Sequence, residues 1–210
     1  MSNKNTAFYA YRKRFQIEIQ ERYNIDADTY IAVTELLTPI ATLLAMRKGE
    51  FLQRAGEPAK YLYWMVAGVT RSGFNTETGT EMTMAFAVEG HSATPYHDLL
   101  GASAGQPARY FIVAETPIEV FRLEWETLTT LLVTNSGLRR YHLQVVEYML
   151  MHQARRGYTH LAASAADRLA SFRRDYPGLE ARISQKVVAS YLEITPQYLS
   201  QLLHAGAAKP

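Results

Sequence analysis

The chain has 210 residues and a mass of 23.8 kDa, a length that fits one large domain or two small ones and excludes a tandem multidomain enzyme. Its apolar fraction of 48% and charged fraction of 20% are those of a globular chain with a real core, which excludes disorder as the main theme. It has no cysteine, which excludes disulfides, cysteine–zinc sites, cysteine-ligated iron–sulfur clusters and a cysteine nucleophile. Because no apolar run resembles a signal peptide or a membrane span, we expect a soluble cytoplasmic protein.

Charge is distributed unevenly along the chain, although the net charge is only +2. From Arg139 onward there are ten Lys and Arg residues against five Asp and Glu, and before it twelve against fifteen. A basic C-terminal third favours a nucleic-acid partner, because clustered cations attract phosphates and release counterions. A solvated surface with uneven charge explains these counts equally well, so charge alone leaves both interpretations open.

The first 124 residues divide into a helical part and a β-rich part. Residues 8–47 show apolar spacings of three and four and are expected to be mainly helical. Between residues 49 and 123, short β-rich runs alternate with turn residues, as in a barrel or sandwich. The expected strands are 61–66, 82–88, 110–114 and 118–123, with hairpin loops at 77–80 and 101–107.

Helical patterns then continue to the end of the chain. A short helix is expected at 124–133 and a long one at about 137–160, which Asn135 or Ser136 can cap. Such a helix spans roughly 36 Å, so we expect its apolar stripe to pack on a second copy of the chain rather than along the barrel. The predicted stripe consists of Leu138, Tyr141, Val145, Tyr148, Met149 and His152.

Residues 184–204 carry the most specific pattern. Ser184 can cap a helix whose buried side is Val188, Ala189 and Leu192. Thr195-Pro196 predicts the start of a second helix, because the hydroxyl accepts an amide and proline fits the first turn. This spacing resembles the helix-turn-helix of bacterial regulators. Glu193 stands where that motif usually has glycine, a substitution that costs on the order of 1 kcal/mol.

The polar side of the second predicted helix is the candidate DNA-binding surface. Gln197 and Gln201 suit base edges in the major groove, and Lys186 suits phosphate. The full set of predicted DNA-contacting residues is Gln185, Lys186, Thr195, Pro196, Gln197, Tyr198, Ser200, Gln201 and His204. The alternative is an ordinary helical hairpin with polar residues facing water.

A second pattern lies in the β-rich part, where glycines mark turns between short strands. It consists of Lys48-Gly49-Glu50, Gly56, Leu62-Tyr63, Val66 and Gly68-Val69. Followed by a long helix and a helix-turn-helix, it resembles the cAMP receptor protein/FNR (Crp/Fnr) superfamily of bacterial transcription regulators over essentially the whole chain.

The resemblance implies an α+β fold in three parts. These are a cyclic-nucleotide-binding-like, cupin-like β-roll (jelly roll) with flanking helices at 1–124, a short helix and a dimerisation helix at 125–164, and a winged-helix-like helix-turn-helix domain at 165–210. It also implies a homodimer that binds double-stranded DNA under the control of the β-roll. RNA polymerase is a further candidate partner, whereas an enzyme activity and a membrane partner are not expected.

The effector motif departs from that family. Its cyclic-nucleotide binders carry a Gly-Glu pair for the ribose and an Arg-Ser or Arg-Thr pair for the phosphate. Aligning Thr116 with the family's strand-end threonine puts Ala108 at the arginine position and Arg109 at the hydroxyl position, and no Gly-Glu pair precedes them. Without the guanidinium the phosphate loses its main charge-assisted bonds, so weak or absent cAMP binding is expected.

No cofactor is assigned from the sequence. His97, Arg109 and Tyr110 are candidates for a pocket that takes some other anionic effector. His91 and His97 stand six residues apart without a metal-ligand pattern, so no metal is expected. Two rival functions are a small-molecule-binding signalling module without DNA binding and a β-roll enzyme, which the ligand spacing disfavours.

Overall fold

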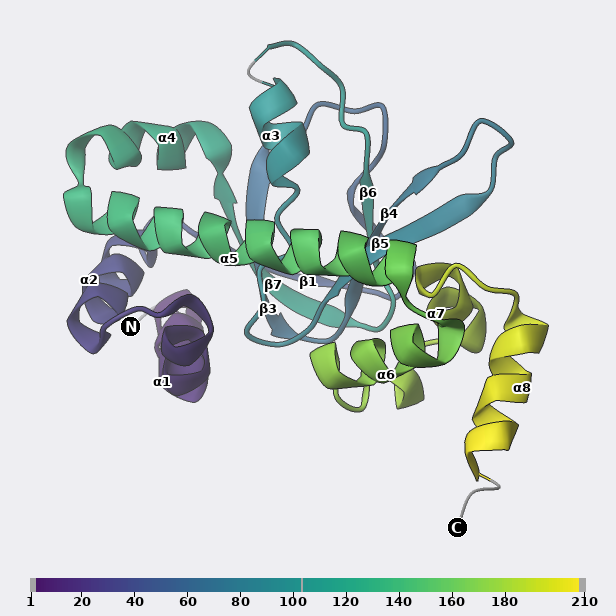
Figure 1. Ribbon diagram of the computed structural model, residues 1–210. Coiled ribbons are helices and arrows are strands. Elements are labelled where there is room, and N and C mark those ends of the chain that lie inside the picture. The colour runs from purple at the N-terminus through teal and green to yellow at the C-terminus, as the bar shows by residue number, and fades with distance from the viewer. Residues whose placement is uncertain (1–2, 103, 208–210) are drawn as a thin grey trace.

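The structure is a computed structural model that describes residues 3–102 and 104–207 (Figure 1). It begins with two helices, α1 (Asn3–Tyr23) and α2 (Ala27–Leu37). The Asp26 side chain caps α2 by accepting the Thr29 N–H at 2.8 Å. The prediction that residues 8–47 are mainly helical is wrong beyond α2, because Thr42–Met46 is a strand. A short apolar run is too short to show whether its hydrophobic periodicity is that of a helix or a strand. Here residues 42–46 form a strand because they pair with residues 118–122.

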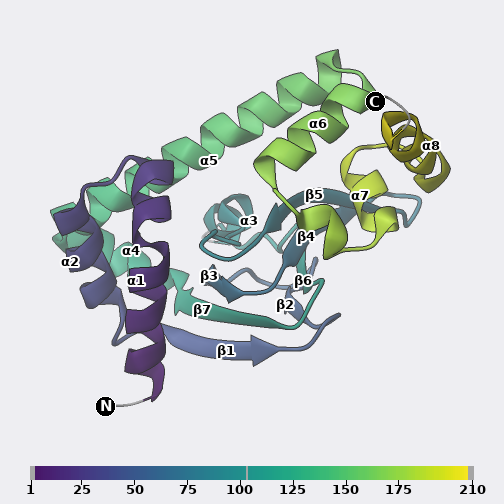
Figure 2. The ribbon, with the colours of Figure 1, turned by 90° about the horizontal axis from the view of Figure 1, so that it is seen from below.

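Seven strands form two antiparallel sheets, in the orders β1-β7-β3 and β2-β6-β4-β5 (Figure 2). The strands are β1 (Thr42–Met46), β2 (Phe51–Gln53), β3 (Tyr61–Ala67), β4 (Thr70–Asn75), β5 (Glu81–Ala87), β6 (Phe111–Ala114) and β7 (Ile118–Glu124). Met65, Ile112 and Val120 are buried in one cluster that joins the two sheets. The four predicted strands are confirmed to within a residue at each end, and β1, β2 and β4 are additional.

Two connections of the β-roll show how local chemistry fixes its shape. Gly68, between β3 and β4, has φ +87°, and a Cβ there would lie 2.3 Å from the carbonyl oxygen of Pro117, so only glycine fits. The predicted loop at 77–80 is confirmed between β4 and β5. The segment 101–107 is not a hairpin loop, because helix α3 (Tyr96–Ala102) precedes it and β6 follows it.

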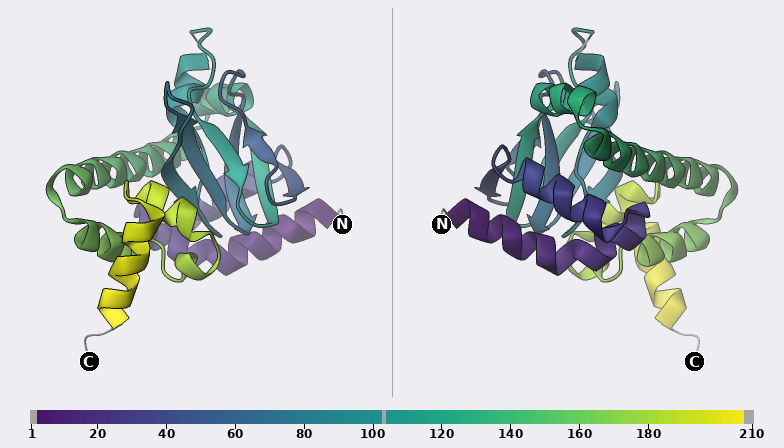
Figure 3. Two further views of the ribbon diagram at one scale, coloured as in Figure 1. Left: turned by 90° about the vertical axis from the view of Figure 1, so that its right-hand side faces the viewer. Right: turned by 90° about the vertical axis from the view of Figure 1, so that its left-hand side faces the viewer.

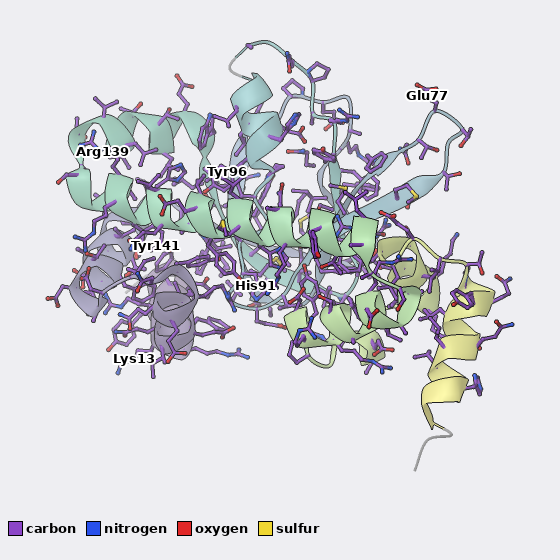
Figure 4. The ribbon with its side chains drawn as sticks, in the orientation of Figure 1. Lys13, Glu77, His91, Tyr96, Arg139 and Tyr141 are labelled. Carbon is purple, nitrogen blue, oxygen red and sulfur yellow. The ribbon has the colours of Figure 1, made fainter. Side chains whose placement is uncertain are left out.

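The helix α4 (Trp125–Thr134) leads into the long helix α5 (Ser136–Ala162), as predicted. Asn135 caps α5 by accepting the Leu138 N–H at 2.8 Å. The first half of α5 packs on α1 and α2, where Tyr141 (labelled in Figure 4) is buried among aromatic side chains. None of the described helices has the length and apolar character needed to cross a membrane.

The C-terminal unit contains α6 (Ala165–Asp175), the 3-10 helix η1 (Leu179–Ala181), α7 (Gln185–Tyr191) and α8 (Pro196–Ala207). Its core is continuous with the β-roll, because the ring of Phe86 on β5 contacts three aromatic rings of this unit. The centroid of the Phe86 ring lies 6.0 Å from Phe172, 5.5 Å from Tyr176 and 5.2 Å from Tyr191. Figure 2 shows α7 lying beside β5.

Two polar contacts reinforce this packing. Ser190 Oγ on α7 accepts the backbone N–H of Thr83 on β5 at 3.0 Å. Arg182 pairs with Glu89 of the β-roll at 2.7 Å. Burial alone would raise the pKa of Glu89, but hydrogen bonds from Arg182 and from the Gly68 N–H lower it to about 2, so the carboxylate stays ionised at neutral pH.

Candidate nucleic-acid interface and sensor site

The helices α7 and α8 meet at a sharp turn. Glu193 has φ 54°, the left-handed conformation that the sequence predicts at this position. Ala189 is buried, and its carbonyl accepts the Ile194 N–H at 3.0 Å. A larger side chain at Ala189 would push the two helices apart, so this small residue sets their close approach.

The predicted caps are both present. Ser184 Oγ accepts the Val187 N–H at 3.3 Å, and Thr195 Oγ1 accepts the Tyr198 N–H at 3.1 Å. Leu199 is buried, whereas Leu202 and Leu203 are half-buried against the same cluster. The apolar side of α8 therefore packs against the core of the C-terminal unit, and its polar side faces solvent.

The predicted DNA-contacting residues lie on one accessible surface. Eight of the nine are exposed, and Ser200 is half-buried. Figure 3 shows α8 projecting away from the β-roll, and no other described element covers its outer side. His204 Nδ1 lies 2.6 Å from the Ser200 carbonyl oxygen, which turns this ring back onto the helix. Gln197 and Gln201 thus form the centre of an uncovered polar ridge.

The three predicted effector residues meet around a side chain that the sequence analysis missed, Asp98 on α3. Asp98 is 2% exposed, and its carboxylate accepts the backbone N–H groups of Arg109 at 2.9 Å and Tyr110 at 3.1 Å. Gln53 Nε2 on β2 donates to it at 2.8 Å, and His97 Nδ1 lies 3.3 Å away. Residues from α3, β2 and the segment just before β6 are therefore joined by one buried carboxylate.

This arrangement uses two backbone amides that could otherwise bind an anion. The amides of Arg109 and Tyr110 already have an anion as partner, and a second anion beside Asp98 would be repelled. The Arg109 side chain is exposed, so only its backbone takes part. An acidic residue inside the apolar run 96–100 was the signal that could have pointed to this site.

The long helix presents a different apolar stripe from the one predicted. Leu138, Tyr141 and Val145 are buried against α1 and α2, so the prediction that they form a stripe for another copy is wrong. Met149 packs against the same cluster, while Tyr148 and His152 lie at its edge, 5.1 Å from the Tyr23 ring and 4.0 Å from Asp175 respectively. These six residues share the face that turns toward the chain itself.

The opposite side of α5 is apolar and exposed. Leu143 and Leu161 are 18 residues apart, five full turns, and therefore lie on one line with Leu150 between them. Their exposed fractions are 54%, 92% and 67%, and Met151 and Tyr158 extend the stripe at 70% and 75%. An exposed apolar band of this length is typical of an interaction surface.

Comparison with known proteins supports the assignment of the fold. Residues 43–135 match the family described as cyclic nucleotide-binding domain. FixK2 from Bradyrhizobium japonicum superimposes with a TM-score of 0.66 at 21% identity, covering 79% of this chain and 84% of that chain. Residues 43–135 therefore match the cyclic nucleotide-binding family, and the chain shares the fold of FixK2.

Two further solved structures share this fold. The c-di-GMP responsive global regulator CLP of Xanthomonas campestris has a TM-score of 0.64 at 15% identity, covering 87% of this chain and 92% of that one. A protein of Eubacterium rectale, described as a transcriptional regulator of the Crp/Fnr family, has a TM-score of 0.63 at 15% identity, covering 83% and 82%. None of the curated proteins compared matches the chain. The resemblance expected from the sequence is confirmed for the fold.

The carboxylate cluster predicts the effect of removing one charge. Asp98→Asn keeps the size of the side chain but leaves N–H donors without an anionic acceptor, and we expect it to lower the free energy of unfolding by about 2–3 kcal/mol. Urea denaturation measures this loss, and hydrogen exchange should show faster exchange at the amides of Arg109 and Tyr110. The control is Glu77→Gln at the exposed tip of the β4–β5 hairpin (Figure 4). Equal stability of both variants would contradict the role of Asp98.

Proposed function

We propose that the chain is a DNA-binding transcription regulator of the Crp/Fnr type. The observation that carries this proposal is the uncovered ridge of Gln197 and Gln201 on the second helix of a capped, sharply crossed helix pair. In helix-turn-helix proteins the second helix enters the major groove and its polar side chains contact base edges. The fold shared with Crp/Fnr regulators supports the same function.

The contacts divide by chemistry. The side-chain amides of Gln197 and Gln201 can make bidentate bonds to the N6 and N7 groups of adenine. Lys186 and Gln185, at the start of α7, are exposed beside α8 and suit phosphate oxygens. Base preference therefore comes from α8, and most of the sequence-independent affinity comes from the start of α7.

We propose a homodimer formed through α5. The exposed stripe of Leu143, Leu150, Met151, Tyr158 and Leu161 is self-complementary if two α5 helices lie side by side about a two-fold axis. Burying it removes a large apolar surface from water. Such a dimer would present two α8 helices to half-sites about 34 Å apart, one turn of DNA.

The β-roll is proposed as a sensor domain that does not bind cAMP. The sequence places Ala108 at the family's arginine position, and Asp98 satisfies the amides that could otherwise hold an anion. An effector of another kind would act by shifting the population of dimer geometries, and only to the extent that it binds one geometry more tightly.

Duplex binding with residue-specific effects is the expected result for DNA recognition. Purified protein titrated against genomic fragments at two salt concentrations should show affinity that falls as salt rises. Gln201→Ala should relax base preference, whereas Lys186→Ala should weaken binding to all fragments alike. The control is Lys48→Ala, an exposed lysine in the turn between β1 and β2.

Salt-independent or absent binding to every fragment would contradict the proposal. It would favour the rival function, a small-molecule-binding signalling module whose helix-turn-helix contacts only protein. If both variants bind every fragment as the parent does, the assignment of Gln201 and Lys186 is wrong even where DNA binding itself is observed.

The sensor proposal makes a separate prediction. Isothermal titration of the full chain with cAMP should give no binding in the micromolar range, because the cyclic phosphate would face the Asp98 carboxylate and lack a guanidinium partner. Micromolar affinity would contradict the account of Ala108 and Asp98. The outcome is independent of whether the chain binds DNA.

A further inference from the structure

A basic pocket lies where α5, α6 and α7 meet, apart from both the Asp98 site and the outer side of α8. It is shallow: most of its 290 Å3 of free space is open solvent at the mouth, and the enclosed part is about 10 Å3, the room of one water, so a ligand would bind at the mouth. The side chains that matter for its chemistry are Arg155, Arg156, His160, Arg168, Ser171 and Asp175. The proposed contacts of the protein with DNA use none of these residues.

The charges in this pocket do not balance. Three arginines line it against one carboxylate, Asp175, which is paired with Arg155 at 2.6 Å. No carboxylate of a described residue lies within 4.0 Å of Arg156 or Arg168. The pocket therefore carries two guanidinium charges that lack an anionic partner.

The partners of these two guanidinium groups are all neutral. Arg168 donates from Nε to the carbonyl oxygen of Leu192 and from Nη1 to that of Ala163, both at 3.0 Å. Arg156 donates from Nη2 to the Thr83 carbonyl oxygen at 3.3 Å, and its guanidinium lies 4.6 Å from the centre of the Tyr191 ring. These contacts fix where the charges point without neutralising them.

One donor of the pocket is unpaired. The Nε of Arg156 is buried and has no hydrogen-bond partner among the described residues, which is rare for a charged donor. His160 is not free in the same way, because its Nδ1 lies 3.2 Å from the Glu193 carboxylate. Burial and the neighbouring Arg156 lower the pKa of its ring, so we count it as no further positive charge in the pocket. A ligand that supplies oxygen acceptors would satisfy the unpaired donor.

We propose that this pocket binds a small oxyanion, the phosphate or carboxylate group of a small molecule. Guanidinium groups match the geometry of such anions and bind them through charge-assisted hydrogen bonds. The anion would lie between Arg156 on α5 and Arg168 on α6. The phosphates of DNA offer the same chemistry, so the test has to separate a free anion from a duplex.

The position of the pocket links the anion to the orientation of α8. Arg156 connects α5 to the Thr83 carbonyl of β5, and Arg168 connects α6 to Leu192 at the end of α7. An anion held by both would join the long helix to the two helices that carry α8. Its binding would favour one orientation of the recognition helix over others.

The test measures anion binding to the full chain in the absence of DNA. Inorganic phosphate should raise the melting temperature in a saturable way, compared with chloride at the same ionic strength. Arg156→Gln should weaken phosphate binding about tenfold, because a charge-assisted partner is lost. Arg139→Gln, an exposed arginine at the far end of α5 (Figure 4), should bind phosphate like the parent.

A second pair of variants keeps the test decisive if the arginine variant fails to fold. Ser171→Asp places a carboxylate in the pocket and should abolish the response to phosphate, while its melting temperature in chloride stays at or above that of Ser171→Ala. Equal phosphate responses in the parent, Arg156→Gln and Ser171→Asp would overturn the proposal. So would the absence of any phosphate response together with weaker duplex binding by Arg156→Gln, which would assign these arginines to DNA phosphates instead.

Discussion

The contact between Phe86 and the aromatic rings of the C-terminal unit determines how the whole chain is arranged. β5 is the edge strand of the four-stranded sheet, and an open edge needs a cover. Here α7 supplies it, because Ser190 Oγ accepts the Thr83 N–H and the Phe86 ring enters the cluster of Phe172, Tyr176 and Tyr191. Buried aromatic pairs contribute about 0.5–1.5 kcal/mol each beyond the burial of their area. The C-terminal unit is thus part of one core with the β-roll and is not a separate domain on a flexible linker.

This arrangement leaves two surfaces available at once. The outer side of α8 is exposed, and the outer side of α5 carries the apolar stripe, so the surfaces proposed for a DNA duplex and for a second copy of the chain do not overlap. In the β-roll, Asp98 joins α3 to the segment just before β6. The amides of Arg109 and Tyr110 therefore already have an acceptor, whereas no carboxylate of a described residue pairs with Arg156 or Arg168 at the junction of α5 and α6.

The features that the sequence predicts well are those with local causes. Capping by Ser184 and Thr195, the turn at Glu193 and the start of α5 at Asn135 each depend on residues within a few positions of one another. The outward face of α5 could not be predicted, because this helix has apolar residues on both sides and only packing against α1 and α2 selects the inner one. β1, the Asp98 cluster and the packing of Phe86 each depend on partners far along the chain. Local residue spacing therefore does not predict these features.

The central claim, that packing on β5 fixes the orientation of α8, is tested most directly by a distance measurement between spin labels. The chain has no cysteine, so Glu119→Cys on β7 and Gln201→Cys on α8 give unique label sites, and excess unlabelled chain removes distances between molecules. The account predicts a single narrow distance distribution, which Phe86→Ala broadens. A broad distribution in the protein with Phe86 intact would show that α8 moves independently of the β-roll and would contradict the account.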